Sequence, residues 1–162
     1  MLEAILYLAG MVVGLDWPDI DQSLRAILPH RSIVTHSLIV PWVVLGAWRE
    51  KGVRHLLAGV SSGIAIHLAA DLLSPMTGYA LIHWPFPFSG ALDAWPSRLW
   101  IAGNAFLGVW LACRIAGTGI MIVLPTVGAA LYYSFFHEHG VLPAVVFGVL
   151  YLLAGGKWRR KA

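Results

Sequence analysis

The sequence predicts an all-α protein, a polytopic transmembrane bundle of five to six helices, on three observations. Of its 162 residues, 59% are hydrophobic and only 12% are charged, whereas a soluble domain has about 25% charged residues. The apolar residues form long runs without Asp, Glu, Lys or Arg, the residues that are costly inside a bilayer. Glycine, polar residues and tryptophan separate these runs, which suits turns and membrane interfaces. Together these features exclude a soluble globular domain and a disordered chain.

Each expected helix corresponds to one apolar run. A spanning helix needs about 20 mainly apolar residues. The shorter run 2–15 could be a sixth helix, a re-entrant segment or a remnant. The five longer runs predict helices near 32–49, 53–73, 98–116, 118–136 and 141–156.

We expect residues 1–162 to form one membrane domain. The single cysteine, Cys113, excludes a disulfide framework within the chain. Two Gly-x-x-x-Gly patterns, at Gly10 and at Gly59, would let helices approach closely within the protein or between copies in an oligomer. The expected domain has a motif-bearing part at 10–90, a helical C-terminal part at 98–156 and a basic tail at 157–162.

The charged residues predict an orientation. The basic tail should face the cytoplasm, and counting helices back from it places eight of the eleven Lys and Arg residues on that face. All five aspartates and six of the seven histidines then lie on the outer face. We therefore expect an integral protein of a prokaryotic inner (plasma) membrane, with a cytoplasmic C-terminus and a polar site on the outer face. The basic residues are explained by the membrane, so no nucleic-acid partner is expected.

Acidic and histidine side chains occur at spacings that suit a metal site. His67 and Asp71 are four residues apart, on one face of a predicted helix. They could hold a metal together, or the aspartate could orient the histidine, or they could share an intrahelical hydrogen bond. Asp19 and Asp21 follow Pro18 and offer two oxygen ligands, or a helix cap.

Basic residues and histidines near the expected second helix add to this site. Mixed histidine and carboxylate ligands suit zinc, manganese or iron better than magnesium, and such an ion can activate water for hydrolysis. Arg31 and Arg25 could bind a phosphate group, although Arg31 could also anchor the chain to lipid headgroups. Trp84 lies in a proline-rich connection that could form a rim over the site or an interfacial anchor.

These motifs resemble those of the YdjM-like family of inner-membrane proteins classed as metal-dependent hydrolases. The matching runs are Trp17-Pro18-Asp19-Ile20-Asp21, His30-Arg31-Ser32-Ile33-Val34-Thr35-His36-Ser37, His67-Leu68-Ala69-Ala70-Asp71-Leu72-Leu73-Ser74-Pro75 and Trp84-Pro85.

The family is in turn remotely similar to the all-helical zinc-dependent phospholipases C and single-strand nucleases. On that resemblance Asp19 or Asp21, together with His36, His67 and Asp71, would be metal ligands. Gln22 stands where the family often has a histidine, and no histidine precedes His30. We therefore expect one or two ions rather than a full cluster.

The expected function is that of an integral-membrane, metal-dependent hydrolase of a phosphoester in a lipid or lipid-linked substrate. The alternatives are a metal-ion or proton transporter and a non-catalytic scaffold stabilised by metal. For the hydrolase we expect the metal to be zinc, with manganese or iron as alternatives. The expected site residues are Asp19, Asp21, His30 and Arg31 for catalysis, Asp19, Asp21, His36, His67 and Asp71 for the metal, and Arg25, Arg31 and Trp84 for substrate.

Overall fold

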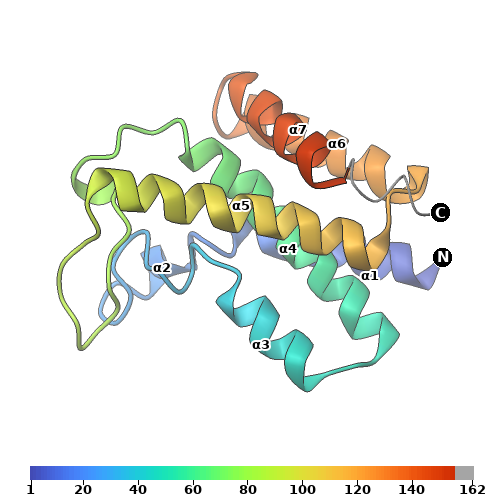
Figure 1. The fold of residues 1–162 in the computed structure, drawn as a ribbon, viewed down its shortest axis with the longest axis horizontal. Coiled ribbons are helices and arrows are strands. Elements are labelled where there is room, and N and C mark those ends of the chain that lie inside the picture. The colour runs from blue at the N-terminus through green and yellow to red at the C-terminus, as the bar shows by residue number, and fades with distance from the viewer. Residues whose placement is uncertain (156–162) are drawn as a thin grey trace.

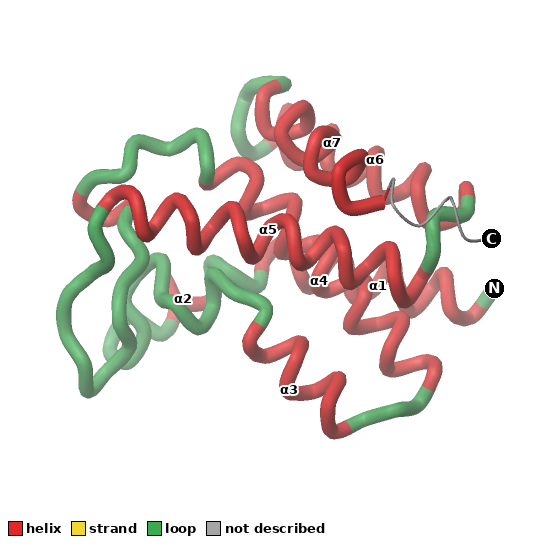
Figure 2. Tube along the Cα trace, in the orientation of Figure 1, coloured by secondary structure: helices red, strands yellow, loops and turns green. Residues whose placement is uncertain are grey.

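The computed structural model describes residues 1–155, and over that range the chain is helical, without a β-strand (Figures 1 and 2). The basic tail expected at 157–162, and the last residue of the helix expected at 141–156, lie outside the described residues. Within residues 1–155, seven α-helices and one 3-10 turn follow each other. They are α1 (Leu2–Asp16), α2 (Ile20–Ser23), α3 (Ile39–Ala47), α4 (Lys51–Asp71), η1 (Gly78–Ala80), α5 (Ala94–Ala116), α6 (Ile120–Phe136) and α7 (Leu142–Gly155).

Helix α4 is the central element of the fold. Every residue from Ser61 to Asp71 is buried, and α4 contacts α1, α3, α5, α6 and α7. Its closest neighbour is α1, because a Cβ on Gly59 would collide with the carbonyl of Tyr7 and one on Gly63 with the carbonyl of Met11. The close approach expected from the glycine patterns therefore occurs within the chain, between α1 and α4.

Most of the expected helices are present with small shifts at their ends. The run 2–15 forms α1, and the helices expected at 53–73, 98–116, 118–136 and 141–156 correspond to α4, α5, α6 and α7.

The helix expected at 32–49 is wrong over its first seven residues, because α3 begins at Ile39. The preceding segment 31–38 forms turns that other elements hold. The Thr35 hydroxyl donates to Asp21 Oδ2 at 2.8 Å. From α5, Trp100 Nε1 donates to the His36 carbonyl at 3.0 Å, and Asn104 Oδ1 accepts from the Leu38 amide at 2.9 Å. Side-chain hydrogen bonds of this kind compete with a regular helix, and here they place Thr35 and His36 in the interior.

The long helices run between two ends of the molecule (Figure 1). At the left end lie α2, the C-terminal end of α4 and the connection to α5, whereas the start of α1 and the α5–α6 turn lie at the right. Within residues 1–155, α4 and α5 are long and apolar enough to cross a membrane, and α6 and α7 are shorter apolar helices. Apolar side chains on the outer faces of α6 and α7 are exposed, with Leu152 at 75%.

Candidate metal site

The C-terminal end of α4 supplies two of the three side chains in the candidate site. His67 and Asp71 are one helical turn apart, so their side chains lie on the same face, with His67 Nε2 3.7 Å from Asp71 Oδ2. Both residues are buried. The spacing expected to bring these two groups together therefore does so, at the end of the helix that the rest of the bundle surrounds.

His36 reaches the same point from the turns before α3. Its side chain is fully buried, and Nε2 lies 3.3 Å from Asp71 Oδ2. The rings of His36 and His67 are nearly perpendicular, with centroids 5.8 Å apart. One ligand atom from each of His36, His67 and Asp71 lies within 4.8 Å of the others, a spacing at which all three can coordinate one ion.

The second nitrogen of His67 fixes the orientation of its ring. Nδ1 lies 3.0 Å from the carbonyl oxygen of Leu15 at the end of α1, and 2.9 Å from the hydroxyl of Tyr133 on α6. A carbonyl oxygen can only accept, so Nδ1 must carry the proton, and Nε2 of the neutral ring keeps its lone pair. Metal-binding histidines commonly donate their other nitrogen to a backbone carbonyl in this way.

His36 is held in a similar manner by a carboxylate. Its Nδ1 lies 3.4 Å from Asp21 Oδ2 and 3.2 Å from the Thr35 hydroxyl. The Thr35 hydroxyl donates its own proton to Asp21, so its oxygen and Asp21 Oδ2 can both accept from His36. The proton of His36 therefore lies on Nδ1. Nε2 is then left unprotonated in the neutral ring and faces Asp71. Asp21, His36 and the candidate ion position thus form a carboxylate–histidine–metal arrangement.

Two buried atoms at the centre of this cluster have no hydrogen-bond partner among residues 1–155. They are His36 Nε2 and Asp71 Oδ2, which face each other across 3.3 Å. A buried polar atom without a partner costs free energy, and two acceptors in contact repel each other. A positive charge between them, from a divalent cation or a second proton on His36, removes both penalties. The donor set therefore fits a cation.

The surrounding groups favour positive charge at this point. Burial alone would lower the pKa of His36, but Asp21 and Asp71 outweigh burial and raise the pKa above its ordinary value. Burial alone would likewise raise the pKa of Asp21, but the contacts with His36, Thr35 and the Ser32 amide hold that pKa below its ordinary value. Asp21 is therefore a carboxylate at neutral pH.

Arg31 closes one side of the cluster. It is buried, and its backbone has a φ of 55°, in the left-handed region that few residues other than glycine adopt. One guanidinium nitrogen donates to Asp71 Oδ1 at 2.5 Å and to the Ser74 hydroxyl at 3.0 Å, and another donates to the Ala80 carbonyl at 2.8 Å. Arg31 thereby occupies one oxygen of Asp71 and leaves Oδ2 for a cation.

The other expected site residues are not members of the group formed by His36, His67 and Asp71. Asp21 contacts His36 Nδ1 and lies 3.3 Å from His30 Nδ1 through its other oxygen. Asp19 is half-buried and accepts a hydrogen bond from Gln22 at 2.8 Å. Arg25 is exposed and lines a cavity, and Trp84 lines the groove beside it.

Sequence reasoning missed Tyr133 and the Leu15 carbonyl. Both contact His67, from positions 66 and 52 residues away along the chain. Neither lies in a motif with the histidines, and a backbone carbonyl has no sequence signal. Only the packing of α1 and α6 against α4 brings them to the site.

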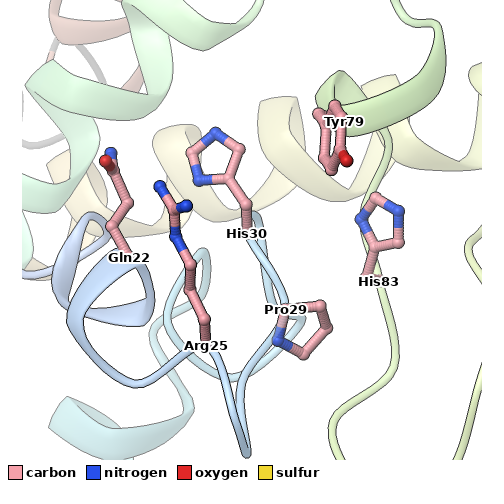
Figure 3. A pocket seen from close by; sticks show the side chains of 6 residues that line it. All are labelled: Gln22, Arg25, Pro29, His30, Tyr79 and His83. Atoms are coloured by element: carbon pink, nitrogen blue, oxygen red, sulfur yellow. The ribbon is translucent and has the colours of Figure 1, made fainter.

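A cavity of about 550 Å³ adjoins the cluster on the side of His30 (Figure 3). His30 lines this cavity, and its ring centroid lies 6.1 Å from that of His36. The cavity is lined by Gln22, Arg25, Pro29, His30, Tyr79 and His83.

Comparisons of the chain with protein-family models, with curated proteins and with solved structures found no match.

Proposed function

We propose that this chain is an integral-membrane, metal-dependent hydrolase that cleaves a phosphoester. The divalent ion, for which zinc is our first choice, is held by His36, His67 and Asp71. The observation that carries the proposal is the pair of buried acceptors, His36 Nε2 and Asp71 Oδ2, that face each other with His67 Nε2 beside them. Two imidazoles and one carboxylate are a ligand set that leaves a coordination position open in hydrolytic zinc sites.

Zinc held by these residues would supply an activated water molecule as the nucleophile near neutral pH. The protein side chains orient the ligands and move protons. Asp21 holds His36 in the correct tautomer. His30 contacts Asp21 and also lines the cavity, so it is placed to exchange a proton with a bound substrate while Asp21 orients its ring. Asp19, two residues before Asp21, is the other carboxylate that we expect to take part in catalysis.

A membrane location is part of the proposal. In addition to α4 and α5, the outer faces of α6 and α7 expose apolar side chains that water would not favour. We propose that α1, α4, α5, α6 and α7 cross the bilayer. The nine residues of α3 extend for about 14 Å. Because α1 and α4 begin at the same end, where Glu3 pairs with Lys51, we propose that α3 and residues 48–50 return the chain across the bilayer between them.

The proposed orientation follows the distribution of basic residues. Arg49, Lys51, Arg54 and Arg114 lie at the helix ends opposite to the metal ligands of α4. Basic connections face the cytoplasm, so the candidate metal site faces outward in a prokaryotic plasma membrane. A substrate there would be a lipid or a lipid-linked phosphate. The motif resemblance to the YdjM-like hydrolases supports the same reaction class, and fold alone would not.

A second candidate, a non-catalytic scaffold stabilised by a metal, is favoured by one observation. Arg31 holds Asp71 in place, and both unpaired ligand atoms are buried. A closed site of this kind suits structural zinc, which holds a fold together without an open position.

Metal analysis and a hydrolysis assay separate these candidates. The protein is purified in detergent with an affinity tag that contains no histidine, and zinc is measured by mass spectrometry for the natural chain, for His36→Ala and for the matched control His137→Ala. His137 is exposed at the end of α6. The proposal expects zinc in the natural chain and in His137→Ala, loss of zinc in His36→Ala, and zinc-dependent release of phosphate or alcohol from phosphoesters. Zinc without hydrolysis of any phosphoester would favour the scaffold, and a natural chain that binds no more zinc than His36→Ala would refute both.

A further inference from the structure

The cavity beside the metal site is formed by two connections that pair with each other. One follows α2 and contributes Arg25, Pro29 and His30, and the other contributes Tyr79 and His83 (Figure 3). His83 is fixed by its backbone, because its amide donates to the Arg31 carbonyl and its carbonyl accepts from the Ile33 amide, both at 2.9 Å. The wall that carries His83 is therefore held against the wall that carries His30.

The lining of the cavity is basic. Arg25 carries a positive charge, His30, His83, Gln22 and Tyr79 add hydrogen-bond donors, and no acidic side chain of residues 1–155 lines it. The Nδ1 atom of His83 is buried and has no hydrogen-bond partner among the described residues. His30 Nδ1 faces Asp21, so the ring edge that bears Nε2 is available to a ligand. A ligand with two negative charges would satisfy these groups, whereas a zwitterionic headgroup would find no carboxylate for its cation.

An apolar groove of about 280 Å³ continues from this cavity, and the two share Arg25, Pro29 and His83. Its further lining includes Ile27, Trp84, Phe86 and Phe88. Phe86 is 72% exposed and Phe88 is 69% exposed. Exposed aromatic side chains at the end of a membrane bundle suit the headgroup layer of a bilayer, so the groove opens where lipid chains begin.

We propose that the cavity and the groove together bind a lipid whose headgroup ends in a phosphate monoester. The phosphate lies against Arg25, His30 and His83, and the hydrocarbon chain follows Ile27, Trp84, Phe86 and Phe88. The inference rests on the proposed function for the membrane location and for the reaction at the neighbouring metal site. It extends that function by naming the substrate class and the residues that select it.

Binding measurements on the full chain in a maltoside detergent test this inference. The probe is dioctanoyl phosphatidic acid, titrated by calorimetry, with dioctanoylglycerol and inorganic phosphate as the two partial ligands. We expect Arg25→Gln to weaken binding of the phosphatidic acid by about tenfold or more, because a guanidinium–phosphate contact is among the stronger hydrogen bonds. His83→Asn should weaken it to a smaller degree. Both partial ligands should bind at least about tenfold more weakly than the phosphatidic acid.

Arg98→Gln is the matched control. Arg98 is an exposed residue of α5 that does not line the cavity, so the variant makes the same charge change outside the proposed site. Its affinity should stay within about twofold of the natural chain. Equal binding by Arg25→Gln, His83→Asn and the natural chain would overturn the inference. So would equal binding of dioctanoylglycerol, which lacks the phosphate, or of inorganic phosphate, which lacks the chain.

Zinc content measured on the same samples separates this inference from the proposed function. If the natural chain holds no zinc but binds phosphatidic acid, and Arg25→Gln binds it more weakly, the metal site is wrong and the lipid-phosphate site is supported. If His36 is needed for zinc but Arg25→Gln and His83→Asn bind phosphatidic acid as tightly as the natural chain, only the lipid-phosphate site is wrong.

Discussion

Helix α4 carries a histidine near each end, and each histidine lies beside a carboxylate, but the two ends differ in their surroundings. Near the start, His55 Nε2 lies 3.4 Å from Glu3 Oε2, and Lys51 contacts the other oxygen of Glu3 at 2.6 Å. Near the end, His67 Nε2 lies 3.7 Å from Asp71 Oδ2.

The difference lies in burial and in a third ligand. The side chains of Glu3 and Lys51 are 43% and 74% exposed, so water and lysine satisfy the carboxylate. Asp71 is 12% exposed, and His36 arrives from another segment to face it. Both ends of α4 therefore have a histidine–carboxylate pair. A cation site requires in addition that the carboxylate is buried and that a third ligand, here His36, reaches it. The predictions below test this distinction.

Replacing Asp71 with Asn should have the largest effect. The change removes the charge of the shared ligand and leaves the buried guanidinium of Arg31 without its carboxylate. Breaking a buried ion pair by removing one partner costs about 3–5 kcal/mol. We expect loss of zinc together with a large decrease in the free energy of unfolding, measured by mass spectrometry and by denaturation in detergent. An Asp71→Asn protein that is as stable as the natural chain and retains zinc would remove the basis of the comparison.

Replacing each α4 histidine with Gln compares the two ends directly. Loss of a residue that merely orients a ligand weakens metal binding about 10–100-fold, so loss of a ligand itself in His67→Gln should weaken zinc binding at least about 100-fold. His55→Gln should bind zinc like the natural chain, because His55 lies among exposed partners. Competition with a chelator of known affinity measures both constants. An equal decrease in zinc affinity in the two variants would contradict a zinc site at the C-terminal end of α4.

Replacing Asp21 with Asn should have an intermediate effect. Asn keeps an oxygen that can accept from Thr35 and the Ser32 amide, but it cannot provide the charge that holds the Nδ1 proton of His36. We expect zinc to remain bound with an affinity about 10–100-fold lower, as for other residues that orient a histidine ligand. Complete loss of zinc, with the fold intact by circular dichroism, would instead identify Asp21 as a ligand.

The same contrast explains how much could be predicted from the sequence. The helices that became α4, α5, α6 and α7 could be predicted because a long apolar run contains the information locally. The pair His67 and Asp71 could be predicted because a spacing of four fixes a common helix face.

The remainder depends on contacts between distant segments. The helix expected over 32–38 is replaced by turns because Asp21, Trp100 and Asn104 bond to this segment. The spacing of Asp19 and Asp21 could not show which of them is buried against His36, since both offer the same carboxylate. Burial of the carboxylate partner distinguishes His67 from His55, and that burial is a property of the assembled bundle.

Replacing Glu3 with Gln should have the smallest effect, and it tests the other half of the comparison. Glu3 is an exposed carboxylate that pairs with Lys51 and His55. An exposed ion pair is screened by salt and contributes little to stability, since water replaces the lost partner. We expect the zinc content, the chelator-derived affinity and the midpoint of unfolding of Glu3→Gln to equal those of the natural chain at moderate ionic strength. If Glu3→Gln lost zinc while Asp71→Asn kept it, the cation site would lie at the start of α4, and exposure rather than enclosure would characterise it.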